Sequence, residues 1–192
     1  QRATALRQYR NYANLAESYS AIPSRFLAVT SGVSAVGKSH VAMRLVEALG
    51  AVRLRSDVER KRLFAGQTPD TGLYSEQNTQ ATYSHLHQLS EMILRCGFPV
   101  VIDATYLKAE QRQGAAQIAE TTGVPFLILD CNAPQAVIAS WLQQRQAEQQ
   151  DPSDATLQVI EAQQASREPL SAAELLQSKR VENNESDSLD KL

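Results

Sequence analysis

Residues 31–40, with the sequence SGVSAVGKSH, contain the spacing G-x-x-x-x-G-K-[ST] of a Walker A loop. Between a strand and a helix, such a loop surrounds phosphates with its backbone N–H groups and the helix N-terminus. Lys38 would pair with the β- and γ-phosphate oxygens, and the Ser39 hydroxyl would ligate Mg²⁺. A glycine-containing turn without a ligand is the alternative. We expect nucleotide contacts along the loop, at Gly32, Val33, Ser34, Ala35, Val36, Gly37, Lys38, Ser39 and His40.

Asp103 and Asp57 could supply the acidic groups of a phosphoryl-transfer site. Asp103 ends the apolar run VVID, where a Walker B acid could hold a magnesium-bound water or accept a hydrogen bond from Ser39. A turn or helix-capping role is the alternative for Asp103. Asp57 would share a helix face with Arg60 and Lys61, so it could accept a hydroxyl proton beside cations that hold an anionic group. For Asp57 the alternative is a helix N-cap.

The elements around these residues alternate between short apolar strands and helices. Strands are expected in FLAVTSG (26–32), AVRLRSD (51–57), FPVVIDAT (98–105) and VPFLILDCN (124–132). Helices are expected at 1–20, 38–50, 58–64, 75–96, 108–122, 133–146, 154–166 and 170–178, with a weakly signalled edge strand near 180–183. This alternation predicts a three-layer α/β/α P-loop NTPase with a mostly parallel sheet of four to five strands and ligands at the strands' carboxyl ends.

The chain organisation follows from this pattern and from composition. Residues 1–24 are expected to be an N-terminal helix or linker, residues 25–178 the main domain, and residues 179–192 a polar, disordered tail. No run of 18 apolar residues or signal peptide is present, so we expect a cytoplasmic protein with no membrane partner. Cys96 and Cys131 lie in apolar surroundings and are expected to be buried, reduced thiols.

Other side chains carry weaker signals. Asp130 ends the fourth expected strand, and the sequence after it favours a turn or capping role. His85 and His87 would point to different faces of a helix, and a surface or packing role is favoured over metal binding. Helix packing is likewise favoured over base stacking for Trp141. Three tyrosines flank the expected cleft: Tyr74, Tyr83 and Tyr106. Of these, Tyr106 is the one most expected to meet a substrate.

The stretches GVSAVGKS, RSDVER, VVIDAT and WLQQR together resemble the P-loop kinases that include the polynucleotide 5′-hydroxyl kinase domain and gluconate kinase. RSDVERKRLF, YSEQNTQATY, VVIDATYLK and PFLILDCNAP are also similar to the ATP-binding domain C-terminal to an aminoglycoside-phosphotransferase-like domain in bacterial fusion proteins. The resemblance covers about residues 25–170 and implies a kinase fold without specifying the substrate. A chain that begins with Gln rather than Met agrees with a preceding domain in a longer protein.

The resemblance also implies roles for individual residues. Asp57 would be the general base for an acceptor hydroxyl, Arg60 would position the acceptor, and Asp103 would contact the P-loop serine. Arg145 in WLQQR would reach the transferring phosphoryl group from a lid helix. A second lid arginine is expected one turn later, where Gln149 stands instead, and Arg167 is a candidate substitute.

We therefore expect an ATP- and Mg²⁺-binding kinase that transfers the γ-phosphoryl group to a hydroxyl of a small molecule or a nucleic-acid end. A regulatory ATP-binding or ATPase module, or a degenerate kinase that serves as an interaction surface, is the alternative if the lid arginines are lost. The net charge is −2. A small-molecule acceptor is slightly preferred to nucleic acid, although five cations lie near Asp57: Arg53, Arg55, Arg60, Lys61 and Arg62.

Overall fold

The computed structural model describes residues 6–13, 24–148 and 156–183, and for residues 143–148 it describes only the helical backbone. The expected N-terminal helix is present at residues 6–13, and the rest of that prediction lies outside the described residues. Among the described residues, no helix has both the length and the apolar character that crossing a membrane would require.

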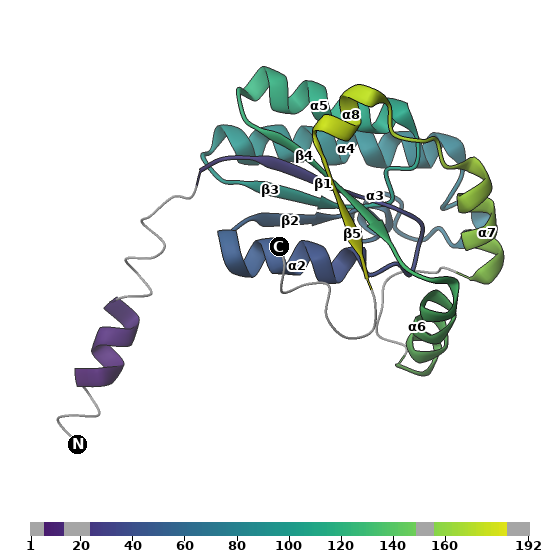
Figure 1. Ribbon diagram of the computed structural model, residues 1–192, viewed down its shortest axis with the longest axis horizontal. Helices are drawn as coiled ribbons and strands as arrows, with labels where there is room; N and C mark the ends of the chain where they lie inside the picture. The colour runs from purple at the N-terminus through teal and green to yellow at the C-terminus, as the bar shows by residue number, and fades with distance from the viewer. Residues whose placement is uncertain (1–5, 14–23, 149–155, 184–192) are drawn as a thin grey trace.

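One five-stranded parallel sheet forms the centre of the molecule (Figure 1). Its strands are β1 (Leu27–Ser31), β2 (Val52–Arg55), β3 (Val100–Asp103), β4 (Phe126–Asn132) and β5 (Ser178–Glu182). They lie in the order β2-β3-β1-β4-β5, and every neighbouring pair is parallel. The predicted fold class is confirmed, and β1 at the centre of the sheet leads directly into the glycine-rich loop.

Helices cover both faces of the sheet, so the molecule has three layers (Figure 1). The helices are α2 (Lys38–Leu49), α3 (Ser56–Leu63), α4 (Glu76–Arg95), α5 (Ala109–Thr122), α6 (Gln135–Glu148), α7 (Leu157–Ser166) and α8 (Ala172–Leu176), with a 3₁₀ turn η1 (Pro69–Thr71). α4 and α5 pack on one face through Leu86, Leu94 and Ala115. α2 packs on the other face through Ala42, against Ala28 of β1.

Alternation along β1 divides its side chains between the two layers. Leu27 and Val29 belong to the cluster under α4 and α5, whereas Ala28 faces α2. Successive strand residues point to opposite faces, so this division follows from the backbone itself. Burying a side chain of the size of leucine contributes about 2 kcal/mol to stability, and all three residues are inaccessible to solvent.

The structure corrects two predictions, one about the C-terminal tail and one about Cys96. β5 pairs with β4 over residues 178–182, so these residues belong to the sheet rather than to a polar tail that begins at residue 179. The weakly signalled edge strand is confirmed, and residues 184–192 lie outside the described part.

Cys96 is exposed, contrary to expectation, because it follows the last turn of α4. Cys131 is buried, and burial raises the pKa of its thiol to about 12.

A buried arginine fastens the segment between α7 and α8 to the core. The Arg112 side chain is 1% exposed and pairs with Glu174 at 2.5 Å. It also donates to the backbone carbonyls of Tyr106 and Pro169, at 3.2 Å each. A buried charge is stable only when it is paired and hydrogen-bonded, and Arg112 meets both conditions. These bonds fix the route by which the chain returns from α7 to β5.

Candidate active site

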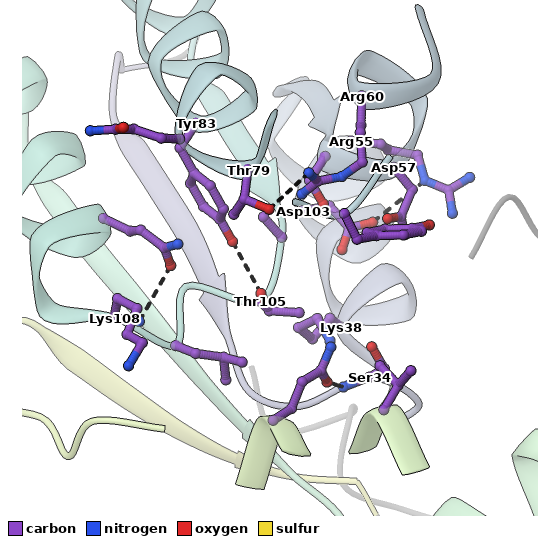
Figure 2. Close-up of a pocket in the computed structure, with 18 of the residues that line it drawn as sticks. Ser34, Lys38, Arg55, Asp57, Arg60, Thr79, Tyr83, Asp103, Thr105 and Lys108 are labelled. Carbon is purple, nitrogen blue, oxygen red and sulfur yellow. Dashed lines mark hydrogen bonds and ion pairs between the residues drawn. The ribbon is translucent and has the colours of Figure 1, made fainter. Parts of the chain in front are cut away.

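A cavity of about 970 Å³ lies at the carboxyl ends of β1, β2 and β3 (Figure 2). Its walls come from the glycine-rich loop, α3, α4, α5, α7 and the turn after β3. The residues used below are Ser34, Ala35, Gly37, Lys38, Ser39, Arg55, Asp57, Arg60, Tyr74, Thr79, Tyr83, His87, Asp103, Thr105, Lys108, Val159, Gln163 and Ser166. The size is that of a pocket for a small-molecule or nucleotide ligand, at the edge of the sheet where parallel α/β proteins bind ligands.

Two glycines of the loop stand where a side chain would collide with the protein. Gly32 has a φ of +141°, and a Cβ there would lie 2.3 Å from the Cys131 carbonyl oxygen. Gly37 has a φ of +81°, and its Cβ would lie 2.6 Å from Asn183 Nδ2. Ala35 adopts a φ of +62°, a left-handed conformation that costs a non-glycine residue about 1 kcal/mol. Cys131 of β4 and Asn183, which directly follows β5, therefore restrict the conformation of the loop.

Replacing Gly32 with alanine should lower the free energy of unfolding by about 2–4 kcal/mol, because both the φ angle and the contact with Cys131 oppose a Cβ. Gly66→Ala is the matched control. Gly66 has a φ of +91°, and no atom of the described residues lies within 4 Å of a Cβ there, so only the backbone strain of about 1 kcal/mol applies. Urea denaturation of both variants measures the difference. Equal costs would show that β4 does not constrain the loop.

The loop serine and the acid at the end of β3 form the expected pair. Ser39 Oγ donates to Asp103 Oδ2 at 2.8 Å. The same carboxylate oxygen accepts a hydrogen bond from Arg53 Nε at 3.1 Å and forms an ion pair with Arg53 Nη2. Arg55 Nε lies 3.7 Å away from it. Asp103 is thus a strand-end acid bonded to Ser39, and it is not the N-cap of the following helix α5, a position that Lys108 occupies.

Lys38 and Ser34 face the same cavity from the loop (Figure 2). Lys38 Nζ donates to the Val33 carbonyl at 2.6 Å. The backbone N–H of Ser34 donates to the side-chain oxygen of Gln163 in α7 at 2.7 Å. The loop therefore presents a cation and a backbone donor to the cavity, and a neighbouring helix already provides an acceptor for that donor.

The opposite wall is built around Asp57 and Arg60, which α3 presents together at i and i+3 (Figure 2). Burial raises the pKa of Asp57, while the charges of Arg60 and Lys38 oppose the increase. Arg60 is 6% exposed, donates from Nη1 to Thr79 Oγ1 at 3.0 Å, and lies 5.0 Å above the Tyr74 ring. Its Nε is buried without a hydrogen-bond partner among the described residues. Asp57 is not the N-cap of α3, a position that Arg55 occupies.

The tyrosines near the cavity differ in their roles from the prediction. Tyr106 is completely buried, and its φ of +42° turns it toward Tyr83, with ring centroids 5.1 Å apart. Tyr106 is therefore a core residue, whereas Tyr74 and Tyr83 line the cavity. The hydroxyl of Tyr83 bonds Thr105 Oγ1 at 3.0 Å and accepts from the Tyr106 N–H at 3.1 Å. This network fixes the turn after β3.

His87 also lines the cavity, where its Nε2 lies 3.2 Å from the Tyr106 hydroxyl. Burial lowers the pKa of His87, so the ring is neutral near pH 7. A packing role agrees with the prediction for this residue, although its position on the cavity wall was not expected. His85 lies apart from it, 3.5 Å from Glu59.

Several expected residues are not brought into the cavity. His40 is exposed and does not line the cavity. Lys61 is exposed on α3 and does not line the cavity either, whereas Asp57 and Arg60 of the same helix do. Arg167 forms an ion pair with Asp130 and donates to Asn132 Oδ1 at 3.2 Å. Asp130 is thus a strand residue that pairs with an arginine, contrary to the expected turn or cap.

The lid arginines are only partly described. Arg145 lies in α6, but its side chain is outside the described part of the structure, as is Gln149 altogether. Of the Trp141 side chain, one ring carbon lies 3.3 Å from where a Cβ on Gly37 would be, so Trp141 packs beside the loop.

The contacts made by Arg53, Thr79 and Gln163 were not predicted from the sequence. Arg53 lies on the edge strand β2, and the register in which β2 pairs with β3 brings it beside Asp103. Thr79 lies in the first half of α4 and Gln163 in α7, and both are common helix residues without a motif. Their contacts connect segments separated by 19 and 129 positions in the chain, and no local pattern signals such contacts.

The residues present fit a nucleotide held with Mg²⁺. Among the described residues, no cluster of three or more His, Cys, Asp or Glu side chains could hold a metal ion. A nucleotide-bound Mg²⁺ needs fewer protein ligands, because phosphate oxygens and waters complete its octahedral shell. The Ser39 hydroxyl and the Asp103 carboxylate are oxygen donors of the required kind, and they lie side by side at the start of α2.

The parallel three-layer fold, the glycine-rich loop after the central strand and the Ser39–Asp103 pair define the chain as a P-loop NTPase. The family model AAA_33, an AAA domain, matches residues 27–170, and the chain belongs to this family.

Solved structures with similar folds include three kinases. A sugar kinase from Janibacter sp. HTCC2649 is 19% identical, covers 83% of this chain and 86% of its own, and has a TM-score of 0.60. For a gluconokinase from Sinorhizobium meliloti 1021, the identity is 18%, the coverage 84% and 83%, and the TM-score 0.57. The APS kinase CysC of Mycobacterium tuberculosis in complex with AMPPNP and APS is 22% identical, covers 74% of this chain and 95% of its own, and has a TM-score of 0.51. At these identities the likeness establishes the fold alone.

Curated relatives include uncharacterized proteins of Mycobacterium tuberculosis and Mycobacterium bovis. They are 29% identical to this chain over 71% of its length. The chain spans only 28% of the length of these relatives, which are therefore much longer proteins.

Proposed function

We propose that this chain is a kinase domain that binds ATP with Mg²⁺ and transfers the γ-phosphoryl group to a hydroxyl of a small molecule. One observation carries the proposal. Lys38 of the glycine-rich loop and Asp57 line the same cavity, and the pKa of the Asp57 carboxyl group is raised by burial. A nucleotide switch requires the loop but has no need of a second acid, besides Asp103, in the same cavity. The three kinase folds reported above agree with this proposal.

The residues would divide the chemistry as follows. Lys38 and the loop N–H groups hold the phosphates, and Ser39 and Asp103 hold the Mg²⁺ that accompanies the nucleotide. Asp57 accepts the proton of the acceptor hydroxyl while that oxygen bonds the γ-phosphorus and the bond to the β–γ bridging oxygen breaks. A raised pKa makes Asp57 a stronger base than an ordinary aspartate. Arg60, fixed by Thr79 and Tyr74, positions the acceptor.

The charges near Asp57 favour a small-molecule acceptor over a nucleic-acid end. Among the five cations that the sequence offers there, Arg53 bonds inward to Asp103, and Arg60 is buried. Arg62 pairs with Glu59 at 3.0 Å. A nucleic-acid site needs exposed cations that follow a phosphate backbone. Arg53 and Arg60 instead bond within the protein, and Arg62 is held in an ion pair at the surface.

A regulatory ATP-binding module is the second candidate, because Arg167 is held by Asp130 instead of facing the cavity. Without a lid arginine at the γ-phosphate, transfer would be slow. Residues 25–183 would form the nucleotide-binding unit in either case. A cytoplasmic location and a further domain in a longer protein remain predictions.

Turnover of ATP by the purified protein with Mg²⁺ tests the proposal. The rate is measured alone and with sugars, aminoglycosides and 5′-hydroxyl oligonucleotides, and phosphorylated product is identified by mass spectrometry. We expect one class of small molecule to stimulate turnover and to become phosphorylated. Stimulation by oligonucleotides would reverse the acceptor assignment, and tight ATP binding with no phosphorylated product from any acceptor would favour the regulatory module.

A further inference from the structure

The contact between α7 and the glycine-rich loop is made by Gln163, which has no role in the chemistry proposed above. Gln163 Oε1 accepts a hydrogen bond from the Ser34 N–H at 2.7 Å, across 129 positions of the chain. The Gln163 side-chain oxygen thus accepts a hydrogen bond from a backbone N–H of the loop, which is the role that a phosphate oxygen would take in a bound nucleotide. Lys38 Nζ is likewise bonded within the protein, to the Val33 carbonyl.

The position of α7 over the cavity follows from its own residues. Ile160 is 3% exposed and belongs to the same apolar cluster as Val33 and Val36 of the loop. Gln163 lies three positions after Ile160, on a neighbouring part of the same helix face. Val159 and Ser166 line the cavity together with Gln163. One face of α7 is thus both packed on the loop and directed at the cavity.

The C-terminal end of α7 is firmly attached. Glu168 donates its N–H to the Leu107 carbonyl at 2.9 Å, and its carboxylate accepts from the Ala109 N–H at 2.7 Å. It also pairs with Lys108 at 3.2 Å. Arg167 is held by Asp130 and Asn132. Because this end of the helix is fixed to the turn after β3, Gln163 is kept at the loop by the fold and not by its hydrogen bond alone.

We propose that Gln163 is a residue of the nucleotide phosphate site, where its side-chain oxygen competes with a phosphate oxygen for the Ser34 N–H. This inference depends on the proposed nucleotide binding. A triphosphate that enters the loop displaces the Gln163 side chain from Ser34, and the lost hydrogen bond weakens the observed affinity. The residue therefore sets how tightly the domain holds ATP, and it connects the state of the loop to α7.

Two substitutions at Gln163 and one at its neighbour test the proposal by isothermal titration calorimetry with a non-hydrolysable ATP analogue and Mg²⁺. Gln163→Ala removes the competing acceptor, so the Kd should fall about fivefold, the equivalent of one hydrogen bond. Gln163→Glu places a negative charge beside the phosphates, so the Kd should rise at least about tenfold and depend on salt. Gln164→Glu adds the same charge at an exposed position outside the cavity lining and should leave the Kd unchanged.

Each deviation has a definite meaning. Equal Kd values for Gln163→Glu and Gln164→Glu would show that Gln163 is not near the phosphates. A weaker Kd in Gln163→Ala would show that the residue assists nucleotide binding and does not compete with it, which overturns the proposal.

Hydrogen exchange of the Ser34 N–H in nucleotide-free protein separates this inference from the proposed function. Exchange should be about fivefold faster in Gln163→Ala than in the wild type, because the acceptor is lost. Unchanged exchange would overturn the contact itself. If exchange becomes faster but the protein binds no nucleotide, the contact is confirmed. The lack of binding would then overturn the proposed function and, with it, the competition.

Discussion

Lys38→Ala should weaken ATP binding at least about 100-fold while the protein remains folded. Lys38 is the only lysine of the glycine-rich loop, and it lines the same cavity as Ser39 and Asp103. Its ammonium group would neutralise the phosphate oxygens in a partly enclosed site, where a charge-assisted interaction is worth about twice a neutral hydrogen bond. Calorimetric titration with ATP and Mg²⁺ measures the loss.

Lys179→Ala serves as the control for charge. Lys179 is an exposed residue of β5 outside the cavity lining, so its removal changes the net charge by the same amount without altering the site. Both variants should unfold at temperatures close to that of the wild type. If Lys38→Ala binds ATP as well as Lys179→Ala does, the loop is not the phosphate site.

Asp57→Asn should reduce phosphoryl transfer by about 10²–10⁴-fold and change the affinity for ATP by less than about threefold. The asparagine has the same shape but cannot accept the hydroxyl proton. The effect requires an acceptor, so single-turnover transfer to the acceptor identified in the turnover assay is the measurement. Asp70→Asn is the control, because Asp70 is exposed in η1. A variant that loses ATP affinity but keeps its transfer rate would show that Asp57 belongs to the nucleotide site.

The pH profile gives an independent reading of the same residue. A general base works only when deprotonated, so the transfer rate should fall as the pH decreases through the pKa of Asp57. Since burial raises that pKa, the fall should begin at a higher pH than for an ordinary aspartate. Asp57→Asn should remove this limb of the profile. A limb that persists in the variant would belong to another group.

The three inner strands β1, β3 and β4 could be predicted because parallel strands covered on both faces are nearly continuous apolar runs. β5 was only weakly signalled, since its sequence SKRVE at the sheet edge buries a single apolar residue, Val181. Asp57 and Arg60 were predicted together because i, i+3 spacing is a local property of a helix.

Contacts between distant segments account for what could not be predicted. The ion pair between Arg53 and Asp103 depends on the pairing register of β2 and β3. The hydrogen bond between Ser34 and Gln163 depends on how α7 packs on the loop. Tyr106 was misjudged because its left-handed backbone turns it into the core, and no glycine or proline marks that turn.

The bond between Asn183 and the glycine-rich loop affects when the site can form during synthesis. Asn183 Nδ2 donates to the Val36 carbonyl across 147 positions of the chain. It stands beside Gly37, where a Cβ would collide with it. Chains emerge from the ribosome N-terminus first. The loop is translated early but obtains its last support only when residue 183 has emerged, so a chain shorter than this should hold β1 and α2 without a finished phosphate site.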